Sequence, residues 1–162
     1  HYTTWRESKM RSSYLEVNSG VSNWDAKLLK VTADYDMVAD ESGAIVLVNP
    51  TATTEINLPA LSTLQSGWNC KIILTEDTDG SDTGMNQIVN IDFGSGNDVV
   101  GHTVCVDGDA GDIAVNNDDY INCSAAATPG DRFDIFTDGV RWYVNGFVAD
   151  GSECLFNTAA AS

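Results

Sequence analysis

The side chains that most often carry catalytic chemistry are sparse in this sequence. Its two histidines are His1, at the terminus, and His102, which follows a glycine in an apolar run. The sequence contains no G-x-S-x-G nucleophile elbow, H-E-x-x-H metal helix or phosphate-binding P-loop. A lone histidine beside a strand usually serves only as a hydrogen-bonding group, so we do not expect His102 to act as a general base.

Carboxylates are abundant, but none of them forms a recognisable catalytic pair. The neighbours Glu76-Asp77 and Asp118-Asp119 lie in polar turns, where Asp and Asn commonly accept hydrogen bonds from their own backbone. A glycosidase needs two carboxyl groups about 5 to 9 Å apart across a cleft, and no spacing in the sequence predicts such a pair. We therefore expect a protein that is not an enzyme.

The acidic loops raise the question of calcium. The segments "TEDTDGSDTG" (75–84) and "DGDAGD" (107–112) carry hard oxygen ligands on glycine-containing loops. The segment "GSGNDVV" (94–100) resembles most of one nonapeptide calcium repeat, but Phe93 replaces the first glycine and no second copy follows. We expect solvated acidic loops, with no metal site and no cofactor, and keep bound calcium as the alternative.

The four cysteines (Cys70, Cys105, Cys123 and Cys154) are 35, 18 and 31 positions apart, so no C-x-x-C zinc pattern exists. An even number allows two disulfides in three pairings. All of them except Cys154 lie inside apolar, strand-like runs, which favours buried thiols. We expect four reduced thiols and keep the disulfides as the alternative.

The elements that must position these groups are predicted to be strands. Helix signals are confined to the beginning of the chain, in "WRESKMRSSYLEV" (5–17) and "NWDAKLLKV" (23–31). From there on, apolar runs of strand length recur between Gly, Asp and Asn turns, in "GAIVLVNP" (43–50), "TTEINLPA" (53–60), "NCKIILTED" (69–77), "NQIVNIDFG" (86–94), "GHTVCVDGD" (101–109) and "GDIAVNNDDYINCSA" (111–125). This pattern predicts an all-β fold, an antiparallel β-sandwich or barrel-like domain, after an extended or partly helical N-terminal arm.

The last two runs, in "FDIFTDGVRWYVNG" (133–146), are joined by an Asp-Gly turn and predict a hairpin. Successive strand residues point to opposite faces. Trp142 and Tyr143 therefore cannot both belong to one sugar-binding platform. We expect one of them in the core and the other at an edge or a subunit contact.

Charge divides the chain into an arm and a body. The 162 residues carry a net charge of −16 and 43% hydrophobic residues, which fits one soluble domain and argues against nucleic acid as a partner. No stretch is apolar enough over the roughly 20 residues that a membrane span needs. Five of the eight basic residues lie in the first 30 positions. We predict an arm (1–30), a β-rich module (31–149) and a tail (150–162). The arm residues expected to contact a partner are Tyr2, Trp5, Arg6, Lys9, Met10, Arg11 and Tyr14.

Three segments carry a family resemblance: "YDMVADESGAIVLVN" (35–49), "EINLPALSTLQSGWNCKIIL" (55–74) and "GDRFDIFTDGVRWYVNG" (130–146). Together they resemble a module of tailed-phage virion proteins of the capsid decoration or head-fibre type. The resemblance implies a non-enzymatic cement protein on the outer surface of a viral capsid. Its implied partner is the major capsid protein, its implied assembly a homo-oligomer with a trimer as first choice, and its implied attachment site the arm. The alternatives are a tail-fibre or adhesion module that binds host surface glycans, and a secreted calcium-dependent binding domain.

Overall fold

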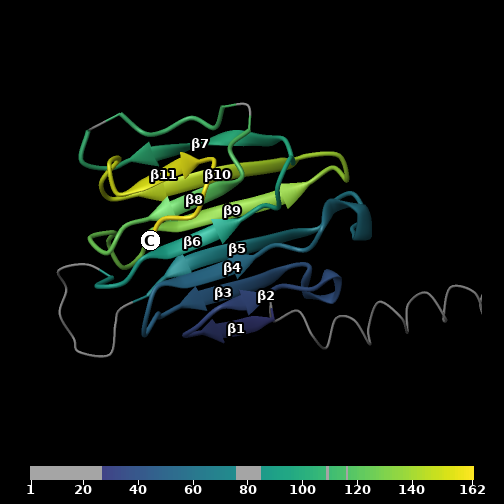
Figure 1. Cartoon of the computed structure of the whole chain (residues 1–162), viewed down its shortest axis with the longest axis horizontal. Helices are drawn as coiled ribbons and strands as arrows, with labels where there is room; N and C mark the ends of the chain where they lie inside the picture. Colours follow the sequence, from purple (N-terminus) through teal and green to yellow (C-terminus); the bar gives the residue numbers. More distant parts are fainter. Residues whose placement is uncertain (1–26, 76–84, 109, 116) are drawn as a thin grey trace, which may run out of the picture.

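The computed structural model describes residues 27–75, 85–108, 110–115 and 117–162. These residues form two β-sheets that face each other (Figure 1), so the predicted all-β sandwich is confirmed. Sheet A has the strand order β1 (Leu28–Val31), β3 (Ala44–Val48), β5 (Asn69–Leu74), β9 (Arg132–Thr137), β10 (Trp142–Val148) and β7 (Val99–Cys105). Sheet B has the order β11 (Cys154–Asn157), β8 (Tyr120–Cys123), β6 (Val89–Asp92), β4 (Thr54–Asn57) and β2 (Tyr35–Asp36).

The described helices are two short 3-10 turns, η1 (Ala39–Glu41) and η2 (Leu61–Thr63). The second lies between the predicted strand segments 53–60 and 69–77. No helix in the described ranges has the length and apolar character that a membrane span requires.

The first six strands alternate between the sheets and stack as parallel coils. β1, β3 and β5 pair in parallel in sheet A, and β2, β4 and β6 do so in sheet B. Antiparallel pairing begins only where β9 joins β5 and β8 joins β6. The expectation of an antiparallel sandwich is therefore wrong for the β10–β7 pair, which is also parallel, and for the first six strands. Each strand there is followed by a crossing to the opposite sheet, and a chain that crosses and returns runs in its original direction.

Two boundaries also differ from those expected. β1 begins at Leu28, inside the expected arm and inside the segment "NWDAKLLKV" that carries helix signals. Pairing with β3 over four residues outweighs the weak helix propensity of this short stretch. β11 lies inside the expected tail and pairs with β8, so the end of the chain belongs to sheet B.

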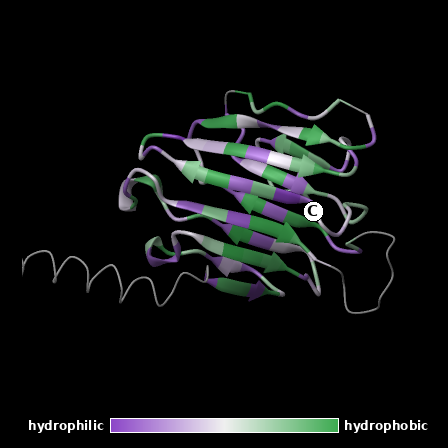
Figure 2. Cartoon of the chain, turned by 180° about the vertical axis from the view of Figure 1, so that it is seen from behind, coloured by the Kyte–Doolittle hydropathy of each residue, from purple (hydrophilic) through white to green (hydrophobic). Residues whose placement is uncertain are grey.

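The core is the layer between the two sheets, filled by alternate residues of each strand. Val46 and Val48 of β3 lie in register with Ile72 and Leu74 of β5, and all four are fully buried. Hydrophobic and hydrophilic residues alternate along the strands of both sheets (Figure 2). The pleat therefore gives each sheet one face in the core and one face toward solvent.

The hairpin predicted at the end of the module is confirmed as β9 and β10. Trp142 is fully buried, donates from Nε1 to the carbonyl oxygen of Phe93 at 3.1 Å, and packs edge-on against Trp68 with ring centroids 5.6 Å apart. Tyr143 points to the outer face of sheet A, but β10 is an interior strand, so Tyr143 does not lie at a sheet edge. The turn contains Gly139 at φ +89°, and Asp138 Oδ1 accepts hydrogen bonds from the amides of Val140 and Arg141.

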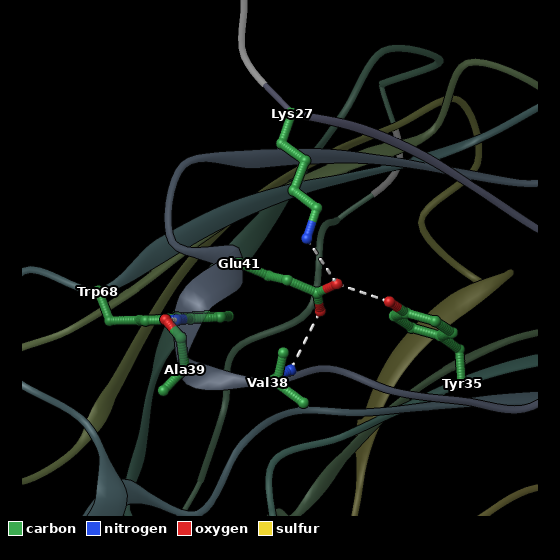
Figure 3. A network of polar contacts seen from close by, with 6 residues as sticks. All are labelled: Lys27, Tyr35, Val38, Ala39, Glu41 and Trp68. Atoms are coloured by element: carbon green, nitrogen blue, oxygen red, sulfur yellow. Dashed lines mark hydrogen bonds and ion pairs between the residues drawn. The ribbon is translucent and has the colours of Figure 1, made fainter. Parts of the chain in front are cut away.

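A buried carboxylate fastens the end of the sandwich that carries β1 and β2 (Figure 3). Glu41 is 3% exposed and accepts hydrogen bonds from Lys27 Nζ at 3.1 Å, the Tyr35 hydroxyl at 2.6 Å and the Val38 amide at 3.0 Å. Burial acts to raise the pKa of Glu41. The hydrogen bonds from Tyr35, Val38 and Lys27, with the charge of Lys27, outweigh burial and lower it below the usual 4.5. Glu41 is thus a charged tie between η1, β2 and the entry to β1.

Replacing Glu41 by Gln should lower the free energy of unfolding by about 1.5–3 kcal/mol near neutral pH, the usual contribution of hydrogen bonds to a charged group. Because the pKa of Glu41 is lowered by folding, its contribution is present above pH 4.5 and is lost as the pH falls through the lower folded-state value. Urea unfolding of both proteins between pH 3 and 7 should show a difference that closes at the acid end. Asp40→Asn, at the exposed neighbouring carboxylate, is the control and should cost much less.

Candidate functional site

The outward side of sheet A is a candidate binding surface, which we call the sheet A face. Register places its side chains in three rows that cross the strands. The rows are Asn69, Phe136, Tyr143 and Val100; then Leu28, Ile45, Lys71, Asp134, Asn145 and His102; then Lys30, Leu47, Ile73, Arg132, Phe147 and Val104.

Large apolar side chains are exposed on this face. Five of them are between 42% and 55% exposed: Leu28, Val100, Val104, Phe136 and Phe147. On the outward side of sheet B, in the described residues, Leu155 is the one large apolar side chain that is comparably exposed. An apolar sheet face of this kind on a protein of high net charge marks a surface that another molecule can cover.

Positive charge gathers on the same face. Of the five basic residues in the described ranges, three (Lys30, Lys71 and Arg132) belong to its rows. The rows contain one acidic residue, Asp134, whose Oδ1 lies 3.2 Å from Lys71 Nζ. The sheet A face therefore has a net positive charge, although the net charge of the whole chain is −16.

Ring contacts hold the aromatic side chains of the face in place. Phe136 and Tyr143 stack with centroids 4.9 Å apart and planes at 10°, and the Arg132 guanidinium lies 4.8 Å from the centre of the Phe147 ring. The Tyr143 hydroxyl also donates to Asp138 Oδ2 at 2.9 Å. That hydrogen bond raises the pKa of Tyr143, and the Arg141 and Val140 amides lower the pKa of Asp138.

A hollow of about 300 Å³ opens on the sheet A face over β3, β5 and β9. Its lining includes Asn69, Lys71, Asp134 and Phe136, which could hold a small polar ligand. Cys70 also lines it, but burial raises the pKa of this thiol to about 12. Cys70 therefore stays protonated near neutral pH and is a poor nucleophile.

The outward side of sheet B has the opposite character. Three carboxylates lie on it, those of Asp36, Glu55 and Asp92. The pKa of Glu55 is raised, first by burial and then by the negative charges of Asp92, Asp34 and Asp36. The end of the chain crosses this side, where Asn90 Nδ2 donates to the carbonyl oxygen of Ala161 and Asn122 Nδ2 donates to that of Ala159. The two outer sides of the sandwich thus differ in charge, in apolar exposure and in covering.

The residues proposed from sequence as partner contacts (Tyr2, Trp5, Arg6, Lys9, Met10, Arg11 and Tyr14) lie outside the described residues. Most of the calcium segment 75–84 does so as well. His102 is on the sheet A face and forms an isolated bridge with Ile113. Asp112 uses its carboxylate to accept from the amides of Phe156 and Ile113. The described ranges contain no cluster of three or more His, Cys, Asp or Glu side chains placed to hold a metal ion.

All four cysteines carry free thiols, in agreement with the expected reduced state. Cys70, Cys123 and Cys154 are buried, and Cys105 is partly exposed. Cys123 and Cys154 lie directly opposite each other on β8 and β11. Hydrogen bonding to Cys123 and burial raise the pKa of Cys154 well above its usual value, so the Cys154 thiol is a poor nucleophile near neutral pH.

No protein-family model, curated protein or solved structure matches this chain.

The sheet A face should tolerate substitution, because its aromatic side chains are not in the core. Phe133 and Phe136 lie on the same strand, but Phe133 is fully buried and Phe136 is 43% exposed. Phe133→Ala should cost about 3–5 kcal/mol of unfolding free energy, as for a truncated core phenylalanine. Phe136→Ala should cost no more than about 1.5 kcal/mol, the upper worth of its ring stack. Denaturant melts of both variants test this, and equal costs would contradict the assignment of the two faces.

Proposed function

We propose that this chain is a non-enzymatic structural protein that attaches to the outer surface of a viral capsid and stabilises it. The observation that carries the proposal is the gathering of exposed apolar side chains and cations on the sheet A face of a strongly acidic protein. The capsid as partner follows from the resemblance of residues 35–49, 55–74 and 130–146 to phage decoration and head-fibre modules.

The chemistry of the face defines the surface it would fit. Burial of Phe136, Phe147 and Val104 supplies association energy, at roughly 25 cal/mol for each Å² of apolar surface removed from water. Lys30 and Arg132 favour an acidic partner over a basic one. The acidic outer side of sheet B faces solvent in this arrangement, where its charge opposes contacts between particles. The partner surface, the major capsid protein in this proposal, is therefore apolar at its centre and acidic around it.

The sheet A face is smaller than a typical stable interface, so attachment should involve more than one contact surface. Six strands about 4.8 Å apart and up to seven residues long give a footprint of about 500 Å². A stable interface buries about 800 Å² on each partner. The proposal therefore keeps the arm as a second attachment, through Tyr2, Trp5, Arg6, Lys9, Met10, Arg11 and Tyr14, and keeps a homotrimer, which would present three faces at once.

Glycan binding is the second candidate, because the hollow over β3, β5 and β9 joins an ion pair to an aromatic ring. A sugar is usually held on the open face of a ring. Here Phe136 and Tyr143 stack on each other, which covers one face of each. The hollow therefore supports glycan binding less well than the whole sheet A face supports a protein partner.

Attachment to purified empty capsids, measured by co-sedimentation, tests the proposal with matched pairs. Phe136→Ala and Arg132→Glu alter the sheet A face, whereas Leu155→Ala and Arg141→Glu alter exposed residues elsewhere. A buried large apolar side chain contributes about 1.5–3 kcal/mol, so Phe136→Ala should weaken attachment about tenfold or more. The control variants should bind as the unaltered chain does.

Equal losses in the face variants and their controls would contradict docking through sheet A. Failure of the unaltered chain to bind capsids, with binding on a glycan array that Asp134→Asn abolishes, would replace the capsid proposal by the glycan one.

A further inference from the structure

Among the residues that the structure describes, the parallel coils are open at one end. In the described residues β1 and β2 are the last strands of sheets A and B, and they lie at the same end of the sandwich (Figure 1). In a parallel ladder alternate residues bond to opposite sides. β1 uses the carbonyls of Lys27 and Val31 toward β3, so the N–H and C=O groups of Leu28 and Lys30 point away from the sheet. These groups form an edge that a further strand can join.

The register of the coils reveals a repeated five-residue pattern. The segments "LLKVT" (28–32), "IVLVN" (45–49) and "KIILT" (71–75) lie in register with one another. The second and fourth residues of each point into the core. The fifth is Thr or Asn, and its amide donates to the fourth residue of the coil below, from Asn49 to Val31 at 2.8 Å and from Thr75 to Val48 at 2.9 Å. Successive coils are thus joined by the same backbone hydrogen bond, from the amide of the fifth residue of one coil to the carbonyl of the fourth residue of its neighbour.

The same pattern occurs once more before β1, as "YLEVN" (14–18). We propose that residues 14–24 of this same chain dock on the open edges of β1 and β2 as an additional coil. Leu15 then packs on Leu29, which is partly buried against the core, and Val17 packs on the buried Val31. The amide of Thr32 donates to the carbonyl of Val17, which repeats the contact seen in the coils above.

The number of residues that follow the five-residue pattern also supports docking of residues 14–24. Three residues (32–34) separate the end of β1 from Tyr35 of β2, and three residues (18–20) separate Val17 from Val21. The shared offset of fourteen positions places Val21 beside Tyr35 and Trp24 beside Val38. Val38 is 53% exposed and Leu28 is 55% exposed. Trp24 and Tyr14 would cover them.

Charge complementarity favours the same register. The offset places Glu16 opposite Lys30 on the outward side of sheet A. Lys30 is exposed, and no described residue forms a salt bridge with it. Opposite charges at directly opposed strand positions stabilise a pair of strands, and like charges destabilise it. The segment matches the edge in apolar pattern, in the length of the first crossing between the sheets and in charge.

This inference goes beyond the capsid proposal and holds whether or not the chain binds capsids. It divides the arm into two parts. Residues 1–13 remain available for a partner, with Trp5, Arg6 and Arg11 among them. Tyr14 then belongs to the body and not to the attachment residues of the arm. Lys30 then pairs with Glu16, which leaves Lys71 and Arg132 as the cations that the sheet A face presents to a partner.

A disulfide trap in the full chain tests the docking. Directly opposed strand residues lie about 4.8 Å apart, within the Cα separation of a disulfide. The double variant Glu16→Cys/Lys30→Cys should form an intramolecular disulfide under mild oxidation, identified by peptide mass spectrometry. The control Glu7→Cys/Lys30→Cys has the same substitutions and the same natural cysteines, and it should not form one. Equal cross-linking in both variants would overturn the proposal, and so would disulfide-linked dimers, because they would show exchange between two copies.

Hydrogen exchange gives a readout without new cysteines. In the full chain the amides of Leu28, Lys30 and Thr32 should exchange slowly. Leu15→Asp puts a charge on the docked side of the segment and should cause these three amides to lose their protection. Met10→Asp makes the same kind of change outside the segment and should leave them protected. Rapid exchange of the three amides in the unaltered chain would overturn the proposal.

Discussion

The pleat of the β-strand is the constraint on which the rest of this structure depends. Successive side chains point to opposite faces, and in both sheets one face is committed to the layer that holds Trp142, Phe93 and Phe133. When the side chain of a strand residue fills this layer, the side chains of the residues before and after it point to the outer face. Burying Phe133 and Ile135 in β9 therefore fixes Arg132, Asp134 and Phe136 on the outer side. The sheet A face is the geometric complement of the core.

The connections between strands determine how these faces are assembled. Crossing from sheet to sheet produces parallel coils, and β8 and β9 extend the two sheets beyond these coils by antiparallel pairing. The other end relies on polar contacts, in which the charged Glu41 ties together Lys27, Tyr35 and Val38. A buried carboxylate is tolerable there because donors from three directions replace its hydration. Among the described residues, the stack of coils is therefore continued by antiparallel strands at one end and stops at the edges of β1 and β2 at the other.

The difference between the two outer sides connects the fold to its proposed role. Sheet B turns acids and amides outward, and sheet A turns aromatic, aliphatic and basic side chains outward, with the Arg132–Phe147 and Phe136–Tyr143 contacts keeping them ordered. Ordered side chains lose less conformational entropy when a partner covers them. A two-sided body of this kind is suited to lying flat on a larger acidic assembly with its own acidic side toward solvent.

The sequence by itself determined the all-β class and the β9–β10 hairpin, because these depend on local patterns. The alternation around Trp142 and the Asp138-Gly139 turn are local in this sense. It could not determine that β1, β3 and β5 are parallel, since an apolar strand reads the same in either direction. Helix propensity misassigned residues 28–31 because pairing with β3 lies outside the segment. The candidate site was missed for the same reason. Its residues come from six strands between Leu28 and Phe147, and only tertiary register brings Lys30, Lys71 and Arg132 onto one face.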